Sequence, residues 1–214
     1  MKAVLKYFFA IYLIAASAVY ARADGLKGLE TFIQTAQSGR ADFTQVVTAP
    51  PKDGQAARSK TSSGTFAFSR PSRFSFQYKK PFEQSIVADG QTLWLYDVDL
   101  NQVTQRKQAD ALGSTPAALI ASAPNLAALK KDFDLQAAPD KDGLQWVQAT
   151  PKAKDGQLLG VRIGLRGDML AALEIQDSFG QRSMLTFSKL EINPSLPSTL
   201  FQFKPPAGAD VVKP

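Results

Sequence analysis

The stretch from Gly64 to Tyr96 constrains the fold of this chain more than any other segment. It contains strand-like runs, GTFAFS, RFSFQY and SIVADGQTLWLY, punctuated by Arg-Pro and Lys-Pro pairs and an Asp-Gly turn. In the first two runs the aromatic residues fall at even positions: Phe66, Phe68, Phe74, Phe76 and Tyr78. Because alternate strand residues share a face, these rings predict a sheet with one face rich in large aromatic groups. Arg70 also stands at an even position and so shares this face. We therefore expect one cation at the edge of an apolar surface that is suited to an apolar ligand.

The N-terminal residues have the pattern of a secretory signal peptide. Two lysines precede an apolar run from Tyr7 to Val19, and Ala21-Arg22-Ala23 forms a small-x-small cleavage site. The run is shorter than the about 20 apolar residues that a transmembrane helix needs. We therefore expect residues 1–23 to be cleaved, leaving residues 24–214 as one domain.

The chain contains neither cysteine nor histidine. Without cysteine, core packing alone must stabilise the fold, and the N-terminal cysteine that carries the acyl chains of a bacterial lipoprotein is missing. Without histidine, Ser-His and Cys-His nucleophile systems and imidazole or thiolate zinc sites are excluded. The formal net charge falls from +6 to +3 once Lys2, Lys6 and Arg22 are removed, which is too small to indicate a nucleic-acid partner.

Two pairs of carboxylates remain as candidates for acid-base catalysis. Asp97 and Asp99, and Asp132 and Asp134, have i, i+2 spacing. Each pair lies beside a turn or is flanked by lysines, which is typical of solvated loops. We therefore expect no enzymatic activity, no metal and no cofactor.

Helical patterns occur at the start of the expected domain and near its middle. Leu26, Leu29, Phe32, Ile33 and Ala36 recur at three- and four-residue steps, which predicts an amphipathic helix over 24–36 with Asp24 as its N-cap. Residues 114–123 (STPAALIASA) predict a second, almost wholly apolar helix, and 125–131 a third short one. So apolar a segment as 114–123 must be covered, and it is the natural plug or lid of a concave surface.

The remaining apolar runs predict short strands joined by tight turns. They cover 41–48, the segment described above, 102–105, 133–138, 143–150, 158–165, 169–176, 183–192 and 201–204. A polar stretch, 49–63, predicts a flap or a disordered loop. The fold class is mainly β (α+β): about eleven antiparallel strands in a half-closed barrel, with two or three short helices as its lid or plug.

Six stretches resemble the periplasmic outer-membrane lipoprotein carrier family, LolA. They are FTQVVT at 43–48, FSRPSRFSF at 68–76, VADGQTLWLY at 87–96, STPAALIA at 114–121, TPKAKDG at 150–156 and FQFKPPAGADV at 201–211. They occur in the family's order over nearly the whole expected domain, and their combination is specific although none is diagnostic alone. One departure is Ala117, where better-known relatives carry a large apolar residue, which puts the packing of the lid in doubt.

The resemblance implies a non-enzymatic, soluble and monomeric periplasmic chaperone without a cofactor. Members of the family accept acylated lipoproteins from an inner-membrane ABC transporter and pass them to a lipid-anchored outer-membrane receptor of similar fold. The absence of cysteine fits the soluble carrier rather than that receptor. Acylated lipoproteins, the transporter and the receptor are therefore the expected partners.

The resemblance also implies roles for individual residues. Arg70 stands where the family has an arginine that latches the helical lid through backbone carbonyls, and a guanidinium offers five donors for this task. Phe74 matches a phenylalanine at the mouth of the family's cavity, so we expect its ring to be partly exposed; ordinary core packing is the alternative. The expected acyl-chain contacts are Phe66, Phe68, Phe74, Phe76, Trp94, Tyr96, Leu119 and Ile120.

Three other functions remain open at this stage. The same cavity could hold a glycolipid or another acylated molecule. A sensor domain that binds lipoproteins as a signal is the second alternative, although such domains are usually fused to another module. A hydrolase using paired carboxylates is the third, and the absence of histidine and of a convincing acid pair argues against it.

Overall fold

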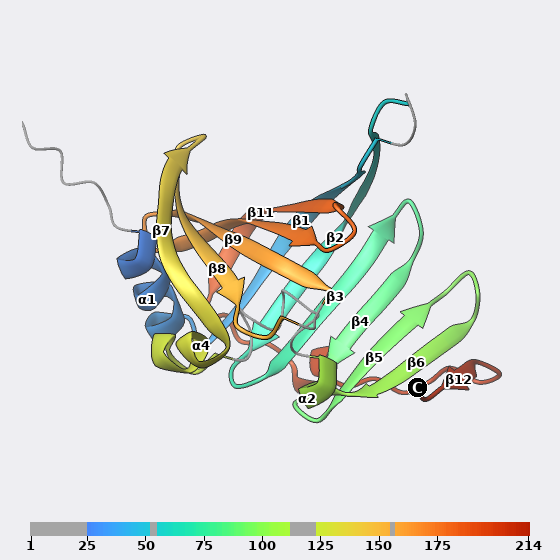
Figure 1. Ribbon diagram of the computed structural model, residues 1–214. Coiled ribbons are helices and arrows are strands. Elements are labelled where there is room, and N and C mark those ends of the chain that lie inside the picture. Colours follow the sequence, from blue (N-terminus) through green and yellow to red (C-terminus); the bar gives the residue numbers. More distant parts are fainter. Residues whose placement is uncertain (1–24, 52–54, 112–122, 155–156) are drawn as a thin grey trace, which may run out of the picture.

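The computed structural model describes residues 25–51, 55–111, 123–154 and 157–214, and these form one large curved sheet with helices inside its curve (Figure 1). The strand order is β12-β6-β5-β4-β3-β2-β1-β11-β10-β9-β8-β7. The strands are β1 Ser38–Ala49, β2 Arg58–Ser69, β3 Arg73–Lys80, β4 Gln84–Ala88, β5 Thr92–Asp97, β6 Gln102–Lys107, β7 Phe133–Lys141, β8 Leu144–Pro151, β9 Leu158–Arg166, β10 Met169–Asp177, β11 Arg182–Ile192 and β12 Asp210–Val212. The predicted mainly β class is confirmed.

The sheet consists of two antiparallel meanders joined at one ladder. Strands β1 to β6 follow one another in space as they do in sequence, and so do β7 to β11. The meanders meet where β1 pairs with β11, from Gly39 opposite Ile192 to Thr48 opposite Arg182. The other ends of the meanders are not paired with each other, so the barrel is half-closed as predicted.

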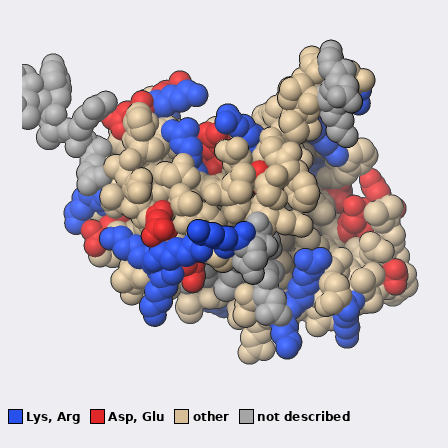
Figure 2. Space-filling view, in the orientation of Figure 1, with Lys and Arg blue, Asp and Glu red and all other residues tan. Residues whose placement is uncertain are grey.

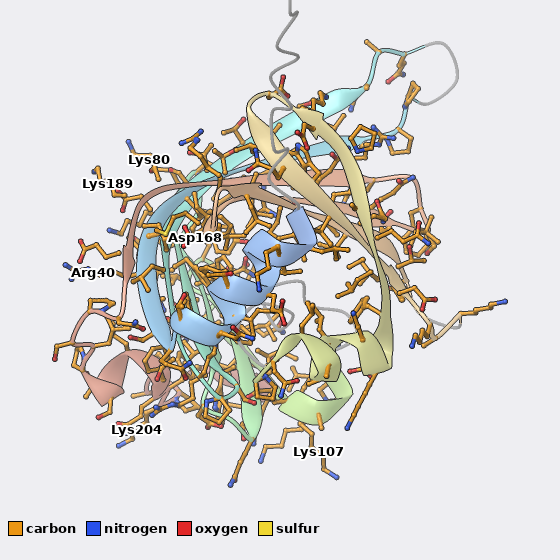
Figure 3. All side chains as sticks on the ribbon, turned by 90° about the vertical axis from the view of Figure 1, so that its left-hand side faces the viewer. Arg40, Lys80, Lys107, Asp168, Lys189 and Lys204 are labelled. Carbon is orange, nitrogen blue, oxygen red and sulfur yellow. The ribbon has the colours of Figure 1, made fainter. Side chains whose placement is uncertain are left out.

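Helices α1 and α4 pack inside the curve because each has an apolar face. Helix α1, Gly25–Thr35, buries Leu29, Phe32 and Ile33, and it contacts β7, β8, β9 and β10. Helix α4, Leu126–Asp132, begins at Asn125, whose side chain accepts a hydrogen bond from the backbone N–H of Ala128 at 2.8 Å. Short α2, Gln108–Ala111, follows β6, and the 3₁₀ helix η2, Ser198–Phe201, follows β11. Figure 3 shows α1 within the hollow of the sheet, while the labelled Lys and Arg side chains lie around its outside.

The structure differs from the predicted strands at two places. The polar stretch 49–63 is strand from Arg58 onward, because β1 and β2 stay paired as far as Ala49 opposite Arg58 and form a hairpin that projects from the sheet (Figure 1), whereas 50–51 and 55–57 are not in a strand. Its polar side chains bury no apolar face, so the two-residue period that identifies a strand is missing. The predicted strand at 201–204 is wrong: the chain crosses the outside of the sheet there, and β12 pairs in parallel with β6 instead.

Candidate functional site

The predicted aromatic face exists, and its four phenylalanine rings are closed to solvent. Phe66, Phe68, Phe74 and Phe76 are exposed by at most 4 %. Phe66 lies at the centre, with ring centroids 4.4 Å from Phe76, 5.5 Å from Phe187 and 5.8 Å from Phe68. We call the following set the concave aromatic cluster: Phe43, Phe66, Phe68, Phe74, Phe76, Tyr78 and Phe187. The rings of β2 and β3 therefore lie on one face, as their even positions predict.

Helix α1 covers one end of the concave aromatic cluster. The ring of Phe32 lies 6.1 Å from that of Phe68, and both residues are almost completely buried. Leu29 and Ile33 belong to the same core, together with Leu129 of α4. An apolar ligand can reach the rings only if part of this helical cover moves.

Arg70 joins two parts of that cover through backbone carbonyls. It follows β2 directly, and its Nε donates to the carbonyl oxygen of Ala36 at 2.8 Å. Its Nη1 donates to the carbonyl oxygen of Ala123 at 2.7 Å. Ala36 lies just beyond the C-terminal end of α1, and Ala123 lies shortly before α4. One side chain thus connects the sheet to both helical segments.

The surroundings of the Arg70 guanidinium are mostly apolar. The side chain is 9 % exposed, and its Cζ lies 5.4 Å from the ring centre of Phe68 and 6.0 Å from that of Phe32. Burial lowers the pKa of Arg70 to about 10, so the group stays charged at neutral pH. Its Nη2 is buried and has no acceptor among the described atoms. The hydrogen bonds therefore act against a substantial cost of removing the cation from water.

A second polar side chain fixes the C-terminal end of α1, and the sequence analysis did not identify it. Asn193 donates from Nδ2 to the carbonyl oxygen of Thr35 at 2.9 Å, and its Oδ1 accepts from the backbone N–H groups of Gln37 at 2.8 Å and Ser38 at 3.1 Å. Its φ of 54° lies in the left-handed region, where asparagine is favoured over most residues. The Asn-Pro pair signalled only a turn.

The predicted exposure of Phe74 at a cavity mouth is wrong. The side chain is 1 % exposed and packs with Phe76, with ring centroids 6.4 Å apart. Phe74 stands opposite Ala88 of β4 and belongs to the same core as Phe32 of α1. Core packing, the alternative interpretation, describes its position.

Trp94 and Tyr96 lie on the other face of the sheet from the concave aromatic cluster. Leu93 and Leu95 of β5 point into the core, so the alternating residues of the strand point outward. Both rings pack on Phe203, at 5.6 and 5.8 Å between ring centroids. The C-terminal segment covers this outer face of β5. Strand β5 is therefore apolar on both sides because one side faces the core and the other packs against the C-terminal segment.

Other expected features lie outside the described residues or have structural explanations. Leu119, Ile120 and Ala117 are not among the described residues. Asp97 accepts a hydrogen bond from the backbone N–H of Leu100 at 3.1 Å, and Asp134 lies 3.7 Å from Lys152. The described residues contain no group of three or more Asp or Glu side chains that could hold a metal ion. None of the described helices is long and apolar enough to cross a membrane.

A cavity of about 710 Å³ lies on the sheet at the projecting β1–β2 hairpin, beyond the concave aromatic cluster. Its walls include Gln45, Lys60, Tyr78, Phe82 and Leu100. We call it the hairpin-end cavity. No motif signalled it, because its residues are polar or mixed in character and come from strands and turns that are far apart in the sequence.

The comparisons with known proteins agree with this architecture. Residues 34–204 match the family model described as "Outer membrane lipoprotein carrier protein LolA". The chain belongs to the LolA family. An outer-membrane lipoprotein carrier protein of Albidiferax ferrireducens is 70 % identical over 213 residues, which cover 98 % of this chain and all of that protein. The corresponding protein of Methylibium petroleiphilum is 55 % identical over 192 residues, 90 % of this chain and 91 % of that protein.

Among solved structures, a LolA superfamily protein from Nitrosomonas europaea aligns with a TM-score of 0.48 at 13 % identity. That alignment covers 84 % of this chain and 98 % of the other. So distant a likeness adds nothing to the assignment, which depends on the sequence relatives. The concave aromatic cluster and the helical segments that Arg70 holds over one end of it are the candidate site.

Proposed function

We propose that this LolA-family protein carries acylated lipoproteins, holding their acyl chains against the concave aromatic cluster after part of the helical cover has moved away. One observation carries the proposal. Aromatic rings that could bind an apolar chain lie on a face that helical segments cover at one end, and a buried arginine bonds both of these segments through backbone carbonyls. A core built only for stability would not need a buried cation at the edge of its cover.

The energetics of burial are consistent with a cover that resists opening. Burying one methylene contributes about 0.8 kcal/mol, so complete burial of three 16-carbon chains would approach roughly 35 to 40 kcal/mol. Non-covalent affinities end near about 18 to 21 kcal/mol. A carrier that must release its cargo therefore buries the chains incompletely or spends part of the binding free energy on opening its cover. The bonds from Arg70 to Ala36 and Ala123 supply such an opposing contribution.

The proposal also covers the compartment in which the protein acts and the proteins that it meets there. The signal-like residues 1–23 direct the chain to the periplasm, where it acts as a monomer. The family resemblance supports an inner-membrane ABC transporter as the donor of cargo and an outer-membrane receptor as its acceptor. The described surface in Figure 2 carries Lys and Arg groups interspersed with Asp and Glu groups, in keeping with protein partners rather than nucleic acid.

A binding experiment with defined cargo tests the function. Residues 24–214 are incubated with a triacylated lipopeptide, and the complex is separated by size exclusion and weighed by native mass spectrometry. We expect one lipopeptide per chain, and no complex with the same peptide lacking acyl chains. If the protein binds a glycolipid but no lipopeptide, the cargo class is wrong; if it binds neither, the carrier function is refuted.

A further inference from the structure

The hairpin-end cavity is a direct continuation of the concave face. Along β1, Phe43 and Gln45 point to the same side, because strand residues two apart share a face. Phe43 belongs to the core and Gln45 lines the cavity. Phe76 and Tyr78 of β3 repeat this relation. The same surface therefore changes from apolar to polar along two neighbouring strands.

Tyr78 marks the boundary between the two regions. Its ring packs on the concave aromatic cluster, 5.0 Å from Phe43 and 6.4 Å from Phe76 between centroids. Its hydroxyl donates to Oε1 of Gln45 at 2.9 Å, and Nε2 of Gln45 donates to Oγ of Ser183 at 2.6 Å. A row of amide and hydroxyl groups thus crosses β3, β1 and β11 at the inner edge of the cavity.

The outer rim of the cavity is apolar and exposed. Phe82, in the turn between β3 and β4, is 57 % exposed, and Leu100, in the turn between β5 and β6, is 71 % exposed. Two of the charged residues at the cavity have local partners: Nζ of Lys60 lies 4.7 Å from the ring centre of Phe82, and the Asp97 carboxylate accepts from the backbone N–H of Leu100. Cations and carboxylates both line the cavity, so it favours a neutral polar ligand flanked by apolar groups.

We propose that the hairpin-end cavity binds the neutral junction of an acylated lipoprotein, namely its glyceryl ester groups and first peptide bonds. The acyl chains then pass Tyr78 and reach the concave aromatic cluster. The cavity volume of about 710 Å³ is in the ordinary range for a small-molecule site. Nε2 of Gln45 carries a second N–H besides the one that it donates to Ser183, and an ester or peptide carbonyl is an acceptor for it.

This proposal rests on the carrier function and adds to it the orientation of the bound cargo in the carrier. The cavity and Arg70 lie at opposite ends of β2, and eight residues from Lys60 to Phe68 span roughly 27 Å of strand. The cargo polypeptide therefore leaves the carrier beside the β1–β2 hairpin, and not at the Arg70 end where Phe74 is buried.

Site-specific photocrosslinking tests this orientation. A benzophenone amino acid replaces Leu100 in one variant and Gln91, an exposed residue in the turn at the Arg70 end, in the matched control. The probe is a tripalmitoylated cysteinyl peptide with biotin at its peptide end. We expect several-fold more crosslinked peptide from position 100 than from position 91. Equal yields, or a higher yield from position 91, would overturn the proposal.

Bound lipopeptide is measured on the same samples by size exclusion, so the two hypotheses are separable. Normal binding with crosslinking at the wrong end refutes only the orientation, whereas no binding refutes the carrier function and the orientation with it. As a second readout, Leu100→Gln should weaken lipopeptide binding a few-fold. The control Leu159→Gln changes another exposed leucine that does not line the cavity, and it should leave affinity unchanged. Equal affinities of the two variants would contradict the proposed contact.

Discussion

Replacing Arg70 with leucine should loosen the helical cover and separate cargo binding from cargo release. The substitution removes the donors that hold the carbonyl groups of Ala36 and Ala123 at 2.8 and 2.7 Å. Each hydrogen bond from a charged group contributes about 1.5 to 3 kcal/mol, so the pair stabilises the closed state by roughly 3 to 6 kcal/mol. This sum alone would shift the balance between open and closed states by two to four decades.

The burial of the cation reduces that figure. Burial lowers the pKa of Arg70 to about 10, which corresponds to a cost of about 3 kcal/mol for keeping the charged group in this site. The net stabilisation of the closed state is then at most roughly 3 kcal/mol, or about two decades. Arg70→Leu should therefore bind a triacylated lipopeptide more tightly, by up to about a hundredfold, and release it to acceptor membranes correspondingly more slowly.

The two ends of the cover should respond differently to this change. Asn193 also holds the C-terminal end of α1, through Thr35, Gln37 and Ser38, and these bonds remain. No second side-chain donor to the Ala123 carbonyl is seen in the part of the chain that the structure describes. Hydrogen exchange should therefore increase around Ala123 and α4 more than in α1.

Arg73→Leu is the matched control for these measurements. Arg73 begins β3, on the other side of the same turn, and contacts Ser69 and the ring of Phe201 rather than the helical cover. It should leave lipopeptide affinity and release unchanged. Wild-type affinity and release in Arg70→Leu, with wild-type exchange around Ala123, would refute the latch.

Three further predictions concern the sheet itself. Phe66→Ala should lower the free energy of unfolding by about 3 to 5 kcal/mol in chemical denaturation, because it removes the central ring of a closed core; a loss below about 1 kcal/mol would mean that the rings are not tightly packed. Gly64→Ala should lower it by about 2 to 4 kcal/mol, since an added Cβ would overlap the backbone carbonyl of Gln77, and a neutral effect would contradict this register. Burial raises the pKa of Tyr78 from 10.0 to about 12, so its contribution to stability is fully present below pH 10 and is lost as the pH rises through 12. Between pH 10 and pH 12 the free energy of unfolding of the wild type should fall by about 3 kcal/mol more than that of Tyr78→Phe, as measured in denaturant titrations. Equal losses would show that the phenol is solvated.

The aromatic face was predictable because a strand has an unambiguous period. Five rings at even positions of two neighbouring strands can share only one side of a sheet, and the side that they share is the inner one. The fold class and the α1 and α4 segments followed from equally local patterns. Arg70 had the right parity for the edge of that face, but the two carbonyl groups that it binds are far from it in sequence and left no signal.

The errors arose where local patterns lack information about the rest of the chain. The sequence predicts Trp94 and Tyr96 as ligand contacts, because nothing in β5 reveals that Phe203 covers its outer face. Polar residues of the β1–β2 hairpin read as a loop, because strand pairing there depends on backbone hydrogen bonds and not on burial. The hairpin-end cavity could not be foreseen, as it depends on where strands and turns that are far apart in the sequence meet.

The single ladder between β1 and β11 allows the two meanders to move relative to each other as if about a hinge. Strand pairing is continuous within each meander, and in the described chain the two meanders pair with each other only along this ladder. A small change of twist there would move the free edges of the meanders apart without breaking a strand pair in either of them. The volume between the meanders can therefore adjust to cargo of different bulk while the secondary structure of the carrier stays the same.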